Sequence, residues 1–439
     1  MFLKDDPILG RVVRSSAHLL STNSLSLALS FLMGLLSARL LGVEGYGLVG
    51  LVMGFASTVN SLLSFRMGEL VVRYGGEYLE RDEKDKLAEL VRAAALAEAV
   101  VSLLAFLVVA LSAGLAEVYL AKRTGTAWMF AVFALGLLAN FNYETSIGIL
   151  QITGRIRMQG VVNLIQSIAG VAIIGAAFLL GGGLVTVLLA YLVGKTILGL
   201  GVFIAAQAGL RPILGAGWWR GRQRAIAEFM PLVHFAVSSN VSATFIKIFR
   251  ESELLWVGYF LSLEAVGYYR AAYTVVSLLS VAVDPLISTV YPELNRLVVQ
   301  RAWPRLQDFL RKVTVLSLVY NLLIALGFVV LGRWILWVYG KQYVAAYPAL
   351  LVLLAGLAFN YTLFWNRPLL LSLGMPGYPV RATLLAGLAK LALAFPIVPR
   401  FGYAAEAALL SLYYIASVGA MAWRGVREIA RRAALERAA

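Results

Sequence analysis

Residues 38–47 read ARLLGVEGYG, and residues 258–268 read GYFLSLEAVGY. Each stretch closes one long apolar segment and opens the next one. Glu44 aligns with Glu264, and a glycine–tyrosine pair follows in both stretches. The chain therefore consists of two similar halves, and a duplicated bundle of membrane helices is how many carriers are built.

The composition indicates a membrane protein. The chain is 61% hydrophobic and 14% charged, with a mean hydropathy of +0.82, whereas a soluble domain carries about 25% charged residues. Cysteine is absent and only two histidines occur, which excludes disulfides, thiol catalysis and a zinc site of several histidines. The net charge of +15 lies largely in short loops between apolar segments, which argues against nucleic acid as a partner.

The apolar segments are long enough to cross a bilayer, since a spanning helix needs about 20 mostly apolar residues. We expect an all-α polytopic membrane protein with about 12 transmembrane helices, six in each half, related by a pseudo-twofold axis along the membrane normal. The predicted domains are an N-terminal bundle over 1–208, a cytoplasmic linker over 209–227 and a C-terminal bundle with a basic tail over 228–439. The predicted spans lie near 15–41, 45–73, 88–112, 126–152, 160–180, 183–207, 228–262, 265–292, 307–331, 344–372, 379–398 and 403–423.

Lysine and arginine predict the sidedness, because cytoplasmic loops are enriched in both. Most of them outside the spans fall on the side that holds both chain ends. The opposite side has few: Lys122, Arg123, Arg333, Lys341 and Arg400. We therefore expect a multi-pass protein of the cytoplasmic membrane with both termini in the cytoplasm. The outer loops are short, so the sequence predicts no folded domain outside the membrane.

Several charged residues fall within or at the ends of apolar spans. A charge at the bilayer centre costs at least about 2.5–3.5 kcal/mol, so such groups must face a partner or a wet cavity. The pattern therefore predicts a hydrated interior. The cations are Arg39, Arg66, Arg73, Lys195, Lys247, Arg250, Arg270, Arg367 and Lys390; the acids are Glu69, Glu98, Glu144, Glu251, Glu253, Asp284 and Glu406.

The densest group of charges lies in the seventh span, where Lys247, Arg250, Glu251 and Glu253 share one helix face. One interpretation is mutual pairing at helical spacing, Lys247 with Glu251 and Arg250 with Glu253. The other interpretation leaves one or both cations for an anionic substrate, since Arg and Lys both bind phosphate.

Each of the remaining intramembrane charges has a structural and a functional interpretation. Lys195, Arg270 and Lys390 lie well inside their spans and are candidates to line a cationic cavity with Lys247 and Arg250. Each could also have a structural role. The acids Glu98, Glu144, Glu253, Asp284 and Glu406 could bind a coupling ion, sodium or a proton, or could pair with a cation. The sequence predicts no cofactor and no catalytic site.

With these features the chain resembles the multidrug/oligosaccharidyl-lipid/polysaccharide (MOP) exporter superfamily, and most of all its polysaccharide-biosynthesis branch, which flips lipid-linked O-antigen and lipopolysaccharide repeat units. The resemblance covers the whole chain. Arg270 departs from the small residues that many relatives carry after the second glycine–tyrosine pair. The stretches that carry the resemblance are residues 39–47 (RLLGVEGYG), 253–273 (ELLWVGYFLSLEAVGYYRAAY), 292–294 (PEL), Tyr339-Gly340 with Tyr343, and 402–406 (GYAAE).

The resemblance implies two six-helix bundles that form a V around a central cavity with alternating access. It implies a flippase that moves an isoprenoid-(pyro)phosphate-linked oligosaccharide from the inner to the outer leaflet. The partners would be this glycan, the lipid bilayer and other glycan-assembly membrane proteins. A cationic interior suits phosphates and acidic sugars.

Three alternatives remain from the sequence. A drug or cation antiporter of the same superfamily would favour cationic cargo, which the intramembrane cations disfavour. A peptidoglycan-precursor flippase usually carries two further C-terminal helices. A membrane glycosyltransferase or glycan polymerase usually presents acidic catalytic residues on large outer loops, and these outer loops are short.

Overall fold

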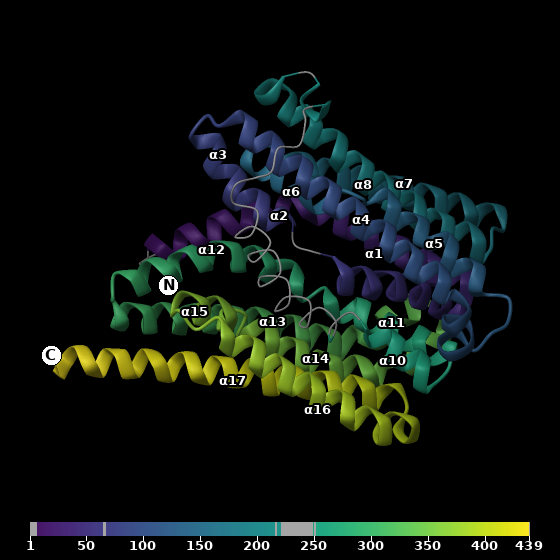
Figure 1. The fold of residues 1–439 in the computed structure, drawn as a ribbon. Coiled ribbons are helices and arrows are strands. Elements are labelled where there is room, and N and C mark those ends of the chain that lie inside the picture. Colours follow the sequence, from purple (N-terminus) through teal and green to yellow (C-terminus); the bar gives the residue numbers. More distant parts are fainter. Residues whose placement is uncertain (1–6, 65–66, 216, 221–248, 250–251, 439) are drawn as a thin grey trace. The chain divides into compact units, whose positions relative to one another are not determined.

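The computed structural model describes residues 7–64, 67–215, 217–220, 249 and 252–438 (Figure 1). Within these ranges the chain is helical and contains no strand, so the predicted all-α fold is confirmed. The first half contains α1 (Pro7–Leu63), α2 (Met67–Leu70), η1 (Val71–Gly75), α3 (Gly76–Glu80), α4 (Lys84–Ala116), η2 (Glu117–Ala121), α5 (Ala127–Ala139), α6 (Tyr143–Ile152), α7 (Arg157–Leu180), α8 (Leu184–Leu214) and η3 (Trp218–Arg220).

The second half repeats this order from α10 onward. Its elements are α10 (Glu253–Phe260), α11 (Leu263–Ser277), α12 (Ser280–Val299), α13 (Trp303–Tyr339), η4 (Lys341–Ala346), α14 (Tyr347–Thr362), α15 (Asn366–Ser372), α16 (Gly377–Phe401) and α17 (Tyr403–Ala438). Contacts divide the chain into two compact units, Ser26–Tyr259 and Met1–Leu25 with Phe260–Ala439. We call them the N-terminal unit and the C-terminal unit; the predicted boundary at 209–227 stays a prediction.

Glycine makes the tight connections between neighbouring spans. Gly42 has φ 66° and ψ −174° inside α1, so α1 is two helices joined at one residue. Gly402 joins α16 to α17 with φ 74°. Both residues occupy the left-handed region, which other residues rarely adopt. The first span therefore ends within the stretch ARLLGVEGYG, as the sequence predicts.

Two helices in each unit are broken where the sequence predicts a continuous span. In the N-terminal unit α1 is followed by α2 after a break, and α5 by α6; in the C-terminal unit α11 is followed by α12, and α14 by α15. Eight helical stretches of the described residues are long and apolar enough to cross a membrane. The predicted spans 126–152 and 265–292 are not among them, and each contains two helices, α5 with α6 and α11 with α12. The stretch Lys341–Ser372 is among them although it contains both α14 and α15.

Exposed apolar side chains mark the part of each unit that faces lipid. On α4 and η2 they run from Leu96 to Tyr119, and on α13 from Val315 to Trp337. At 1.5 Å per residue each belt is about 33 Å tall, close to the hydrocarbon thickness of a bilayer. The chain is therefore a multi-pass membrane protein. Both α4 and α13 begin several residues before the belt, at the end of it that we call the lower edge.

Candidate functional site: polar groups within the spanning helices

Lys390 and Glu406 form a buried ion pair between α16 and α17. The Lys390 Nζ lies 2.8 Å from the Glu406 Oε1, and the two side chains are 5% and 0% exposed. In the described chain, neither Glu406 oxygen has another hydrogen-bond donor. A buried charge is retained only with a partner, because its desolvation costs several kcal/mol. The pair therefore joins the last two helices of the C-terminal unit, and it brings a predicted cavity cation and a predicted acid together.

Glu98 of α4 caps the beginning of α6 from a neighbouring helix. Its Oε1 accepts from the backbone N–H of Glu144 at 2.7 Å, and its Oε2 from that of Thr145 at 2.9 Å. The first amides of a helix have no partner within the helix and favour a negative charge. Asn142 occupies the N-cap position but does not cap α6 with its side chain. Glu98 thus stabilises the break between α5 and α6.

The C-terminal unit holds the corresponding break with neutral groups. Asn321 of α13 donates from Nδ2 to the Thr362 Oγ1 at 3.2 Å, and Ser317 donates to the Thr362 carbonyl at 2.9 Å. Asn321 follows Glu98 by the same number of residues as Asn366, the first residue of α15, follows Tyr143, the first residue of α6. The third helix of each half therefore supports the break of the fourth at equivalent positions, with a carboxylate in one half and an amide in the other.

Lys195 of α8 lies against α5 in the N-terminal unit. Its ammonium is 5.7 Å from the centre of the Phe133 ring, and its carbonyl accepts from Asn140 Nδ2 at 3.3 Å. A Cβ added at Gly136 would lie 3.1 Å from the Lys195 Cδ, so the glycine makes room for the side chain. The half-buried cation is supported by an aromatic ring, an arrangement that stabilises a charge of this kind.

The other described candidates lie in α6, α10 and α11. Glu253 is buried in the first turn of α10, while Glu144 and Arg270 are half-buried in α6 and α11. None of the three is without a partner. Lys247 and Arg250 lie outside the described residues, as does Glu251. Asp284 belongs to α12, but its side chain is outside the description.

Asn321, Ser317 and Thr362 were not among the residues predicted from sequence. They are neutral, and the search for intramembrane charge therefore passed over them. Alignment of the two halves on Glu98 would have indicated Asn321. Among the described residues, no group of three or more His, Asp or Glu side chains could hold a metal ion.

Three tyrosines from the stretches that carry the family resemblance pack together in the C-terminal unit. The Tyr268 ring lies 6.4 Å from the Tyr343 ring and 5.6 Å from the Tyr403 ring, and its hydroxyl donates to Glu264 at 2.8 Å. Tyr343 is fully buried. Residues from three separate stretches that carry the family resemblance thus meet in one aromatic cluster, at the end of the unit where Gly402 lies.

Comparison with solved structures shows the fold. An inward-facing multidrug-resistance MATE-family transporter of the MOP superfamily matches with a TM-score of 0.73 and 11% identity, over 94% of this chain and 95% of that one. The lipid II flippase MurJ in an inward closed conformation matches at 0.69 and 14%, over 94% and 89%. A MOP superfamily transporter from Pyrococcus furiosus, described by the reverse polarity of its binding pocket, matches at 0.65 and 14%, over 98% and 97%.

The fold is therefore the one seen in solved transporters of the MOP superfamily. No curated protein matches the chain in sequence. The model of the family described as "Polysaccharide biosynthesis protein" matches residues 12–298. The chain belongs to this family, and the resemblance inferred from the two repeated stretches is confirmed.

Proposed function

We propose that the protein flips an isoprenoid-(pyro)phosphate-linked oligosaccharide or polysaccharide repeat unit from the cytoplasmic to the outer leaflet. The observation that carries this proposal is membership of the polysaccharide biosynthesis family over residues 12–298, in a chain with a transporter fold. The lipid tail would stay in the bilayer while the halves alternate access to the headgroup. The protein performs no covalent chemistry in this scheme.

Cations within the spans suit an anionic headgroup. Lys195 and Arg270 are half-buried in α8 and α11, and we assign both to substrate binding together with Lys247 and Arg250. Lys390 pairs with Glu406 at 2.8 Å inside the buried contact of α16 with α17. We therefore expect Lys390 to act through the packing of α16 on α17, and the other four to act on phosphate directly.

The location follows from the same proposal. The protein would lie in the cytoplasmic membrane with both termini in the cytoplasm, because an undecaprenyl-type glycan carrier is loaded on that side and the basic loops face it. Other membrane proteins of glycan assembly would supply and consume the lipid-linked glycan. Glu253 and Asp284 are proposed coupling acids for sodium or a proton.

Flipping in reconstituted vesicles tests the proposal. The probe is a fluorescent short-chain isoprenoid-pyrophosphate oligosaccharide, and transfer is followed by a membrane-impermeant quencher. We expect protein-dependent transfer that falls at least tenfold in Arg270→Gln and in Lys195→Met, since each loses a charge-assisted contact worth about 1.5–3 kcal/mol.

Arg333→Gln is the matched control, because Arg333 lies at the far end of α13 with its guanidinium 4.9 Å from the Tyr347 ring. It removes one positive charge and changes none of the four residues assigned to substrate binding, so transfer should be unchanged. Absence of transfer together with ion-coupled uptake of an organic cation would reject the flippase in favour of the antiporter.

A further inference from the structure

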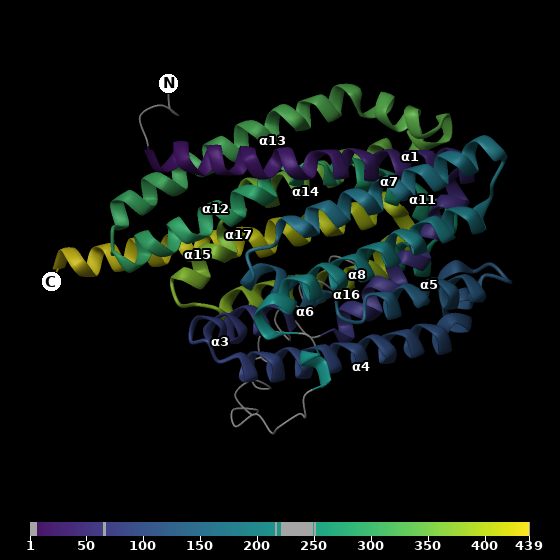
Figure 2. The ribbon, with the colours of Figure 1, turned by 90° about the horizontal axis from the view of Figure 1, so that it is seen from above.

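The last helix extends well past the lipid-facing belt. The Trp303 indole N–H donates to Glu436 at 2.7 Å, which sets α13 and α17 in register. Val315, at the lower edge of the belt on α13, is about 18 Å from Trp303 along the helix. The same distance measured back from Glu436 along α17 reaches the turn of Trp423. Trp423 therefore lies at the membrane edge, and residues 424–438 lie below it. The end of α17 projects beyond its neighbours in both views (Figures 1 and 2).

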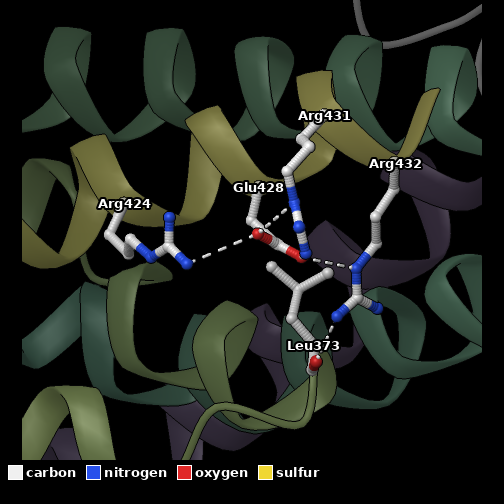
Figure 3. A network of polar contacts seen from close by, with 5 residues as sticks. All are labelled: Leu373, Arg424, Glu428, Arg431 and Arg432. Atoms are coloured by element: carbon white, nitrogen blue, oxygen red, sulfur yellow. Dashed lines mark hydrogen bonds and ion pairs between the residues drawn. The ribbon is translucent and has the colours of Figure 1, made fainter. Parts of the chain in front are cut away.

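On the buried face of this segment, one carboxylate pairs with three arginines of the same helix. Glu428 is 2% exposed and accepts from Arg431 at 2.7 Å and Arg432 at 2.9 Å, while Arg424 lies 3.5 Å away (Figure 3). Arg432 also donates to the Leu373 carbonyl at 2.8 Å, in the connection between α15 and α16. The Glu428 pairs lie within α17, so the Arg432–Leu373 and Trp303–Glu436 bonds are the contacts that fix the rotation of the segment about its axis.

Fixing the rotation decides which residues face outward. The exposed positions recur at helical spacing and include no acid in residues 423–435: Trp423, Val426, Arg427, Ala430, Arg431, Ala434 and Leu435. Glu428 is buried and pairs with arginines of α17 itself, while Glu436, just beyond this range, is exposed and accepts from Trp303 of α13. The Arg427 guanidinium lies 5.1 Å from the Trp423 ring, so the two side chains stack.

We propose that Trp423, Val426, Arg427 and Arg431, here named the tail stripe, bind the headgroups of anionic phospholipids in the inner leaflet. Tryptophan favours the membrane interface, and arginine binds phosphate with a planar pair of donors. Arg427 lies about 6 Å below Trp423, within a headgroup layer about 5–8 Å thick. Arg431 lies one turn lower and pairs with Glu428 at 2.7 Å, but its side chain is 65% exposed, so its guanidinium can also meet a phosphate at this layer.

The charge of the tail stripe selects anionic over zwitterionic lipid. Two arginines one turn apart are about 6 Å from each other, a spacing that one or two phosphates can bridge. The site is separate from the proposed glycan path, and it would anchor the cytoplasmic end of α17 whatever cargo the protein carries.

The purified protein in zwitterionic nanodiscs, titrated with phosphatidylglycerol and followed by native mass spectrometry, tests this site. A basic residue near the membrane surface contributes about fivefold to anionic-lipid affinity. We expect Arg427→Gln to weaken phosphatidylglycerol binding about fivefold. Arg427→Gln/Arg431→Gln should weaken it further, by a second factor below about fivefold, because Glu428 already balances part of the Arg431 charge. Arg333→Gln carries the same charge change elsewhere and should have less than a twofold effect.

Further measurements distinguish a lipid headgroup from a free phosphate, and a bound lipid from a second copy of the chain. Free glycerol phosphate should not compete at millimolar concentration, because Trp423 and Val426 require an acyl chain at the interface. Equal binding by wild type and the double variant would overturn the proposal, as would equal losses in the double variant and Arg333→Gln. A protein-concentration-dependent dimer that the double variant abolishes, with lipid binding unchanged, would assign the stripe to a second copy of the chain.

Discussion

The buried pair of Lys390 and Glu406 shows what single residues contribute in a bilayer. Each is costly alone, and each is tolerated because the other lies 2.8 Å away. The sequence identified both as unusual charges within spans but did not pair them. Pairing depends on how α16 and α17 rotate against each other, and hydropathy contains no information about that rotation.

Removing one member of this pair should be severe. We expect Lys390→Met to destabilise the protein by about 3–5 kcal/mol, because it leaves the Glu406 carboxylate buried without a cation. The double variant Lys390→Met/Glu406→Gln should recover most of the loss. Thermal unfolding in detergent measures both.

The control for that pair is Lys312→Met, which removes the partner of Asp308 at the surface, where the two side chains are 29% and 58% exposed. Exposed pairs contribute about 0–1 kcal/mol, so its melting temperature should stay close to that of wild type. A similar loss in Lys312→Met and Lys390→Met would contradict the special role of the buried pair.

Glu98 gives a second test at this scale. Glu98→Ala leaves the amides of Glu144 and Thr145 without their acceptor, which we expect to cost about 1–3 kcal/mol for each amide. Glu98→Gln keeps one carbonyl oxygen and should lose about half as much. Hydrogen exchange at residues 144 and 145, measured by mass spectrometry of the surrounding peptide, should accelerate in both variants and most in Glu98→Ala; unchanged exchange would rule out the cap.

At the level of helices, the broken spans explain where sequence-based prediction stopped. Residues 126–152 are mostly apolar, so hydropathy alone joins α5 to α6. Within the segment, the polar residues Asn140 and Asn142 mark the break and lie between the helices. The carboxylate that caps α6, Glu98, belongs to α4. The capping contact is non-local and could not be read from the segment itself. The equivalent break after α14 depends in the same way on Asn321 of α13.

Close helix crossings at the break between α1 and α2 require glycine. A Cβ added at Gly148 of α6 would lie 2.8 Å from the Gly68 carbonyl of α2 and 2.9 Å from the Val71 Cβ. We expect Gly148→Ala to destabilise by about 1–3 kcal/mol, since the backbones must separate. Thermal unfolding and protease resistance would report the loss.

The same substitution at Gly160 makes an informative contrast. Gly160 lies within α7, where an added Cβ meets nothing within 4 Å. Gly160→Ala should therefore stabilise the protein by about 0.4–1 kcal/mol, through the lower entropy of the unfolded chain. If Gly148→Ala and Gly160→Ala shift the melting temperature in the same direction, the α2–α6 crossing is less tight than these distances indicate.

At the scale of the whole molecule, duplication made the fold predictable. The repeat of GVEGY in LEAVGY, the length of the apolar segments and the low charge together predicted an all-α transporter of two similar halves. Substrate residues were less accessible to prediction, because intramembrane charge marks a pair such as Lys390–Glu406 as readily as a binding site. Neutral support residues such as Ser317 left no trace in composition.

The proposed sidedness has a direct test, because the chain contains no cysteine that would need to be removed. We expect Thr124→Cys, in the connection between α4 and α5, to react with a membrane-impermeant maleimide in intact cells. Leu435→Cys, exposed on the tail of α17, should react only after the membrane is permeabilised. Labelling in the opposite order would reverse the orientation and with it the direction of transport.

Gly42 and Gly402 each connect two helices through a single residue, and the predicted sidedness puts both connections on the outer side of the membrane. A protease needs several extended residues to bind its substrate, and these connections offer none. Among the connections on that side, residues 122–126 form one of the few segments with room for an inserted epitope. On intact cells the protein should therefore be nearly invisible to proteases and antibodies, and a tag placed within residues 122–126 would be the practical way to detect it.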